Sequence, residues 1–172
     1  FDYSNSGYAL LAAIIERVSG MTFDAFCAEH VFKPAGMKDA AMIGYGPLDP
    51  TAPKNALGRV PKIDRGVGFT DRPTTFTFAD GDELSWGYRG SCGAVATIHD
   101  MFAWDRALRN DKFLSAKLRA ELWASPVSAD DGKYGLGWYV DSRAPLGAYA
   151  SHSGVVLGVV AYYLRFLDAD VV

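Results

Sequence analysis

The sequence is poor in cysteine, in basic charge and in long hydrophobic runs, and each shortage removes a class of function. Its two cysteines, Cys27 and Cys92, form no C-x-x-C pair, which argues against a zinc or redox site and favours two buried free thiols over a disulfide. The 17 Lys and Arg are scattered and outnumbered by the 20 Asp and Glu, so we expect no nucleic-acid partner. The longest apolar stretch, Val155 to Leu164, is about half the length of a membrane-spanning helix. No transmembrane segment is predicted.

Two nucleophile motifs are also missing. No serine is followed by a lysine three positions later; Ser115 has Lys117 at the second position instead, which lies around the helix from the serine. No G-x-S-x-G sequence is present, so the nucleophile elbow of another hydrolase fold is excluded. The three histidines are too dispersed for a metal cluster, and we predict neither a metal nor a cofactor.

The periodicity of apolar residues predicts helices at the start of the chain. A helix is expected over residues 7–19, after Ser6 and closed by Gly20, because apolar residues recur there at helical spacing. Thr22 is expected to cap a second helix that Pro34 and Gly36 end. From residue 39 to about residue 93 the helical period disappears, and this stretch holds nine of the 18 Gly and five of the eight Pro. A connection of that length predicts a cleft wall with short strands of its own, one of them over residues 72–78.

Ordered structure is predicted again from Thr97. Thr97 and Asp100 form a capping box that starts a helix ending at Leu108, and Ser115 is expected to cap another helix with Leu118 and Leu122 inward. Strands are predicted over residues 134–140 and 155–167, the second central and buried on both faces. Helices followed by strands predict the α+β class, with helices packed on an antiparallel sheet.

The ends of the sequence suggest that this sheet is incomplete. The chain starts at Phe1 rather than Met, two residues before a motif of catalytic type, and stops at Val172 where a second strand is expected. We therefore expect residues 1–172 to be one partial domain, with a helical and loop part over about 1–130 and strands over about 131–172. The absence of a signal peptide says nothing about the compartment.

Two short motifs carry candidate chemistry. Tyr3 and Asn5 face the same way in an extended segment, where a phenol beside a cation serves as a general base and an amide clamps a substrate. Alone, this motif is better explained as a helix-capping turn with a packed tyrosine. His152, Ser153 and Gly154 are expected to open the last strand, where the glycine gives room for a ligand and the following amide, that of Val155, donates to an oxyanion. Alone, this motif is better explained as a surface histidine at a strand start.

Together with their surroundings, these motifs resemble the penicillin-recognising serine hydrolases, which include β-lactamases, D,D-peptidases and esterases. The resemblance extends over almost the whole chain and rests on the order and spacing of the motifs. In chain order they are Tyr3-Ser4-Asn5, Phe32-Lys33-Pro34-Ala35-Gly36-Met37, Gly90-Ser91-Cys92-Gly93 with Thr97, Asp100 and Trp104, Tyr134-Gly135-Leu136-Gly137-Trp138, and His152-Ser153-Gly154 followed by Gly158.

The resemblance implies a β-lactamase/transpeptidase-like fold and an acyl-enzyme mechanism in which the serine of an S-x-x-K segment attacks a carbonyl. Tyr3 then corresponds to the general acid/base, and the Val155 amide to half of the oxyanion hole. Asn5, His152, Ser153 and Gly154 correspond to substrate-binding residues. In the family, the S-x-x-K segment precedes the tyrosine motif, so its absence here fits a truncated sequence better than a dead enzyme.

His152 stands where many members carry lysine, which points away from typical class C β-lactamases and towards peptidases or esterases acting on D-amino-acid peptides or small esters. Two alternatives stay open: a non-catalytic module that binds peptidoglycan-type ligands or partners, and a structural α+β piece without a cleft function. Many family members are periplasmic or secreted, but compartment, oligomeric state and exact substrate are not determined by these residues.

Because the chain contains no Ser-x-x-Lys motif, we predict that it forms no stoichiometric covalent adduct with a reactive penicillin. Intact-mass spectrometry after incubation measures this directly. Without a nucleophile, only the contribution of binding and of oxyanion donors remains. A mass increase of one penicillin per chain would contradict the prediction.

Overall fold

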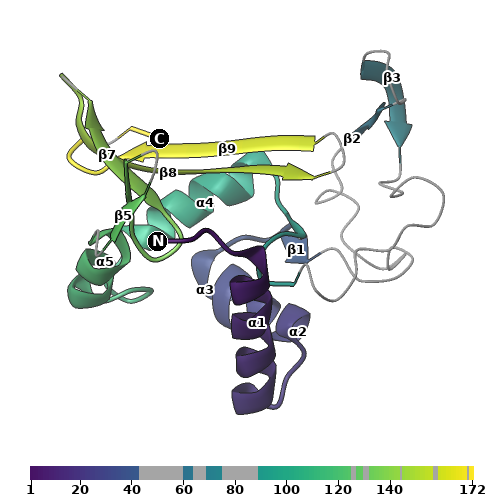
Figure 1. Cartoon of the computed structure of the whole chain (residues 1–172). Helices are drawn as coiled ribbons and strands as arrows, with labels where there is room; N and C mark the ends of the chain where they lie inside the picture. The colour runs from purple at the N-terminus through teal and green to yellow at the C-terminus, as the bar shows by residue number, and fades with distance from the viewer. Residues whose placement is uncertain are drawn as a thin grey trace. The chain divides into compact units, whose positions relative to one another are not determined.

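A computed structural model describes most of the chain. The described residues are 1–42, 60–63, 69–74, 89–124, 127–129, 132–143, 145–156, 159–169 and 171–172. They form two compact units, one made of Phe1–Tyr3 with Leu108–Val172 and the other of Ser4–Ala107. Figure 1 shows helices and antiparallel strands along the chain, and the α+β prediction is confirmed.

The Ser4–Ala107 unit begins with helix α1, Asn5–Ser19. The helix starts two residues earlier than predicted, because Ser4 rather than Ser6 is the cap: its hydroxyl accepts a hydrogen bond from the Gly7 amide at 3.0 Å. Gly20 ends the helix at a φ of 70°, a conformation that glycine adopts without steric cost.

The buried face of α1 is made of small residues, although the apolar periodicity that predicted this helix is carried mainly by larger aliphatic residues. Ala9 and Ala12 are buried, whereas Leu10, Ile14 and Val18 are exposed in the described structure. The small face is required by the segment at Gly90, where an added Cβ would lie 2.4 Å from the Tyr8 carbonyl oxygen. Close approach of two backbones selects small residues at the contact.

The second helical segment has three consecutive parts: α2 (Phe23–Cys27), a π-helical turn η1 (Ala28–Phe32) and α3 (Lys33–Ala35). Thr22 caps α2 by accepting from the Ala25 amide, as predicted. Pro34 lies inside α3 rather than ending it, because the first turn of a helix needs no amide donor at that position. Gly36, at a φ of 77°, ends the segment.

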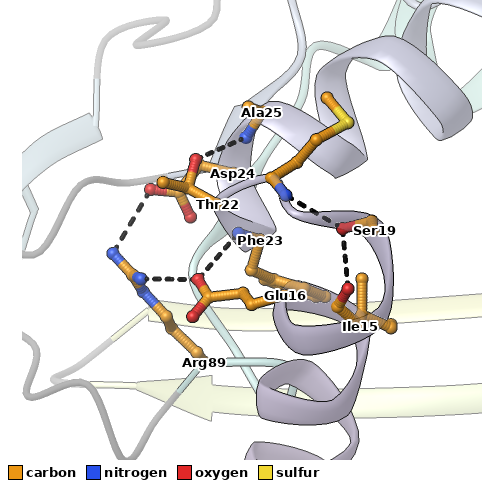
Figure 2. Close-up of polar contacts among 9 residues, drawn as sticks. Ile15, Glu16, Ser19, Thr22, Phe23, Asp24, Ala25 and Arg89 are labelled. Carbon is orange, nitrogen blue, oxygen red and sulfur yellow. Dashed lines mark hydrogen bonds and ion pairs between the residues drawn. The ribbon is translucent and has the colours of Figure 1, made fainter.

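Arg89 joins α1 to α2 by two ion pairs, drawn in Figure 2. Its guanidinium lies 3.0 Å from a carboxylate oxygen of Glu16 and 3.5 Å from one of Asp24. The same Glu16 oxygen accepts from the Phe23 amide at 2.8 Å. Burial raises the pKa of Asp24, and the Arg89 charge opposes that rise. The arginine therefore permits a carboxylate to be placed in a half-buried helix–helix contact.

Two short antiparallel pairs complete this unit within the described residues. Strand β1 (Ala41–Met42) pairs with β4 (Ala94–Val95), and β2 (Val60–Ile63) pairs with β3 (Phe69–Thr74). The strand predicted over 72–78 overlaps β3, and its residues beyond Thr74 lie outside the described structure.

Helix α4, Ile98–Leu108, starts at the predicted capping box. The Asp100 amide donates to the Thr97 hydroxyl at 3.1 Å, and the Thr97 amide donates to the Asp100 carboxylate at 2.9 Å. The other carboxylate oxygen accepts from the Asp39 amide at 3.2 Å. Asp100 therefore both caps α4 and holds the segment that leads into β1.

Within the residues that the structure describes, the unit with the C-terminal half of the chain contains helix α5 and a five-stranded sheet. Helix α5, Ala116–Trp123, is capped by Ser115 as predicted, but Leu118 is exposed rather than inward. The strands follow one another in space as they do in sequence, each antiparallel to the next. They are β5 (Val127–Ala129), β6 (Gly132–Tyr134), β7 (Tyr139–Arg143), β8 (Gly147–Val156) and β9 (Val159–Phe166).

Both predicted C-terminal strands are wrong in their boundaries. The strand expected over 134–140 is interrupted by a turn, so that Tyr134 ends β6 and Tyr139 begins β7. The strand expected over 155–167 is the end of β8 and the whole of β9, which run side by side in Figure 1. The motif at His152 consequently lies in the second half of β8 instead of opening a strand. β9 is an edge strand of the described sheet, and its Val160 and Tyr162 are exposed.

Both cysteines are free thiols, as predicted, but only Cys27 is buried and Cys92 is half-buried. Burial raises the pKa of Cys27 to about 11. No helix in the described part of the chain combines the length and the apolar character that crossing a bilayer requires.

Replacing Asp100 with Asn should destabilise the chain by about 1–3 kcal/mol at neutral pH, because one buried donor loses its acceptor. Burial raises the pKa of Asp100, but hydrogen bonds from the amides of Thr97, Asp39 and Lys38 and from the Thr97 hydroxyl outweigh it and hold the pKa below its usual value. The stabilisation is therefore complete above the unfolded-state pKa and is lost as the pH falls through the lower folded-state pKa.

Urea unfolding at about pH 7 and at about pH 3 measures the loss of stability and its dependence on pH, since a free aspartate titrates between these two pH values. The difference between wild type and Asp100→Asn should shrink at the lower pH. Asp2→Asn, which removes an exposed carboxylate, is the control and should leave stability unchanged at either pH. An equal loss of stability in Asp100→Asn at both pH values would show that the ionised carboxylate is not what stabilises the fold.

Candidate active site

Aromatic rings surround His152 in the unit formed by Phe1–Tyr3 and Leu108–Val172. The ring centroid of His152 lies 6.1 Å from that of Tyr3, 6.0 Å from that of Tyr134 and 5.7 Å from that of Tyr139. Phe1 packs on Tyr134 at 5.0 Å. The structure thus brings together Tyr3 and His152, two of the residues singled out in the sequence, from opposite ends of the chain.

Both nitrogens of His152 have hydrogen-bond partners. Nε2 lies 3.0 Å from the Tyr134 hydroxyl, and Nδ1 lies 2.7 Å from the Ser153 carbonyl oxygen. Tyr134 is buried, with 4% of its surface exposed, whereas Tyr3 is 45% exposed. The imidazole therefore lies beside two phenols, one buried and one that solvent or a ligand can reach, and the two phenol rings are themselves 6.1 Å apart.

The strand β8 extends beyond its partner β7. The last residue pair between them is Ser151 with Tyr139, whereas pairing with β9 continues to Val156. The Leu167 amide donates to the Ala148 carbonyl on the β9 side. Backbone groups alternate sides along an antiparallel strand, so the even-numbered residues of β8 face β9, as Ala148 does. The N–H and C=O groups of Ser153 and Val155 are therefore directed to the β7 side, where no described strand pairs with them.

The positions around this open edge are accessible. Ser153, Gly154 and Val155 are all exposed, Val155 with 70% of its surface. A Cβ added to Gly154 would meet nothing within 4 Å, so the glycine leaves room along the strand. An exposed row of backbone donors and acceptors is a site at which an extended ligand or an oxyanion can bind.

Asn5 belongs to the other unit, where it is the exposed first residue of α1. The expectation that it shares a cleft with Tyr3 stays a prediction. No group of three or more His, Cys, Asp or Glu suited to a metal ion occurs among the described residues.

Tyr134 is the site residue that sequence reasoning missed. It was assigned to a strand, although it begins the glycine-rich motif Tyr134-Gly135-Leu136-Gly137-Trp138. The motif is a tight turn: the Gly135 amide donates to the Trp138 carbonyl at 2.8 Å, and Gly137 has a φ of 84°. Two glycines around one apolar residue were the available signal for this turn.

The turn rests on the C-terminal end of α5. The Leu136 amide donates to the Leu122 carbonyl at 3.1 Å, and a Cβ on Gly135 would lie 2.6 Å from that same carbonyl oxygen. Arg165 of β9 covers the ring of Trp123 at 5.1 Å, so the end of α5 also packs on the sheet. These contacts fix where β6 ends, and with it the position of the Tyr134 ring.

A phenol, an imidazole and a strand with open amides are groups that transfer protons and stabilise developing negative charge. Comparisons with known proteins bear on which chemistry they serve. The whole chain, residues 1–172, matches the family model described as Beta-lactamase. A penicillin-binding protein of Bacillus subtilis (strain 168) is 31% identical over 96% of this chain and 37% of its own length.

A D-aminopeptidase of Brucella anthropi is 28% identical over 65% of this chain and 19% of its own length. The crystal structure of a penicillin-binding protein from Bacillus halodurans superposes with a TM-score of 0.68 at 23% identity, over 98% of this chain and 48% of that one. The predicted β-lactamase/transpeptidase-like fold is thereby confirmed. The chain spans about a third of the length of the first of these relatives.

Gly135→Ala should cost about 1–3 kcal/mol of stability, because its Cβ overlaps the backbone of α5 and forces a shift. Gly154→Ala is the matched control: the new Cβ enters open space, and the change should be neutral or stabilise by up to about 1 kcal/mol. Chemical denaturation of both variants tests the pair. Equal stability of the two variants would show that the turn does not rest on α5 as described.

Proposed function

Since the chain belongs to the Beta-lactamase family, we propose that it is part of a serine hydrolase that acts through an acyl-enzyme on D-amino-acid peptides, β-lactams or small esters. The nucleophilic serine and its lysine are supplied by an S-x-x-K segment outside this chain. The observation that carries the proposal is the placement of Tyr3 and His152 beside each other at the open edge of β8.

In this proposal Tyr3 is the general acid/base. Its side chain is accessible and its ring faces that of His152 at 6.1 Å, so a proton can pass between the phenol and a group bound at the edge. A phenol normally titrates near pH 10. The lysine of the S-x-x-K segment is the neighbouring cation that makes it a base at lower pH.

The Val155 amide is proposed as one oxyanion donor, and the amide of the nucleophilic serine as the other. Val155 supports this role because its amide is directed to the side of β8 that no described strand occupies. A donor fixed in a sheet needs no reorganisation as charge develops on the substrate. Ser153 exposes backbone groups on the same side, which suits an extended substrate, and Asn5 is proposed as an additional clamp on that substrate.

Histidine at position 152, where many family members carry lysine, supports peptides and esters over β-lactams as good substrates. An ammonium keeps its charge at neutral pH and has three donors, whereas an imidazole is largely neutral there. A substrate carboxylate is therefore held less firmly at His152 than at a lysine. Among the relatives, the D-aminopeptidase is consistent with this class of substrate.

Labelling tests the proposal on the protein encoded by the complete gene. We expect a fluorescent phosphonate or penicillin to label one serine, and Tyr3→Phe to slow labelling by about 10²–10⁴-fold, the usual contribution of a general acid/base. Tyr149→Phe is the control, because Tyr149 packs on Phe166 in the sheet and should label at the wild-type rate. Absence of labelling in a folded protein would favour the alternative of a non-catalytic ligand-binding module.

A further inference from the structure

The hydrogen bonds of His152 determine which of its nitrogens carries the proton. The Ser153 carbonyl can only accept, so Nδ1, at 2.7 Å, is the donor to it. In the neutral ring Nε2 then carries the lone pair, and the Tyr134 hydroxyl at 3.0 Å donates to it. The carbonyl of Ser153 is available for this bond because it is directed to the side of β8 that β7 does not reach.

Tyr134 is held rigidly enough to enforce this arrangement. Only 4% of its surface is exposed, and its ring is packed by Phe1, by Tyr3 and, edge to face at 4.8 Å, by Tyr139. The turn at residues 135–138 follows directly and is fixed on α5 by the Leu136 amide. The phenol ring is therefore packed on several sides, with its hydroxyl 3.0 Å from Nε2.

We propose that Tyr134 is a positioning residue that holds His152 as the neutral Nδ1–H tautomer and sets the imidazole ring beside Tyr3. In a free neutral imidazole the proton exchanges between both nitrogens, so a single tautomer has to be imposed by the partners of the two nitrogens. The neutral ring then has no N–H left for a ligand. This role deepens the proposed function, on which its effect on catalysis depends, but the tautomer itself does not depend on catalysis.

The tautomer can be measured by ¹⁵N-edited NMR of the chain labelled at histidine. The chain has three histidines, and His152→Gln identifies the signals of residue 152. At about pH 8.5, where an ordinary imidazole is neutral, we expect a protonated Nδ1 and an unprotonated Nε2 in the wild type. A protonated Nε2, or a fast-exchanging mixture, would overturn the proposal without any variant.

Tyr134→Phe keeps the ring and removes the donor to Nε2, so only the Ser153 carbonyl still favours the Nδ1–H form. The signals of His152 should therefore move towards those of an exchange-averaged mixture. Tyr139→Phe is the matched control: the Tyr139 ring also lies beside His152, but the proposal gives its hydroxyl no role, and the tautomer should stay that of the wild type. An unchanged tautomer in Tyr134→Phe, or the same change in both variants, would overturn the proposal.

Kinetics on the protein encoded by the complete gene separate this inference from the proposed function. Loss of one hydrogen bond should lower kcat/KM for a D-amino-acid ester by about five- to tenfold in Tyr134→Phe, with Tyr149→Phe, whose ring packs on Phe166, at the wild-type value. An inactive wild type with the expected tautomer would refute the proposed function alone. An active wild type whose His152 has a protonated Nε2 would refute the positioning role alone.

Discussion

The unit that carries the site depends on the contact between Gly135 and the C-terminal end of α5. A Cβ at this position has no room beside the Leu122 carbonyl, so the chain passes close to the helix and turns back within residues 135–138. The turn makes β7 begin at Tyr139, and pairing with β8 therefore stops at Ser151. One contact thus leaves the edge of β8 open and places Tyr134 against His152.

Elements specified by local chemistry were predictable from the sequence. The caps at Thr22, Thr97 and Ser115 were found because a side-chain oxygen three residues before an amide donor defines them without tertiary context. The boundaries of the two C-terminal strands were missed for different reasons. Gly135 and Gly137 signalled the interruption of the first strand and were overlooked, whereas apolar β-forming residues continue from β8 into β9. The burial of Leu118 and of the large aliphatic residues of α1 could not be predicted either, for another reason. The side that a helix buries is decided by its neighbours in the fold.

For the site, sequence reasoning could name residues but could not supply their partners. Tyr3 and His152 were chosen from separate motifs at opposite ends of the chain, and their proximity is visible only in the structure. Tyr134 was overlooked because an aromatic residue at the end of a predicted strand is normally part of the core. Its buried ring fits that expectation; its hydroxyl, which needs a partner when buried, does not. The roles of Asn5 and of the Val155 amide stay predictions.

A histidine that is hydrogen-bonded at both nitrogens changes how a ligand can be recognised. With Nδ1 bonded to the Ser153 carbonyl and Nε2 to Tyr134, a neutral imidazole offers a substrate its ring face but no donor. In the proposed function, recognition of a substrate carbonyl then rests on the backbone amides of Ser153 and Val155, which are directed to the open side of β8. If His152 stands where many family members carry lysine, as the resemblance implies, a mobile ammonium is replaced by an imidazole whose two nitrogens already have partners.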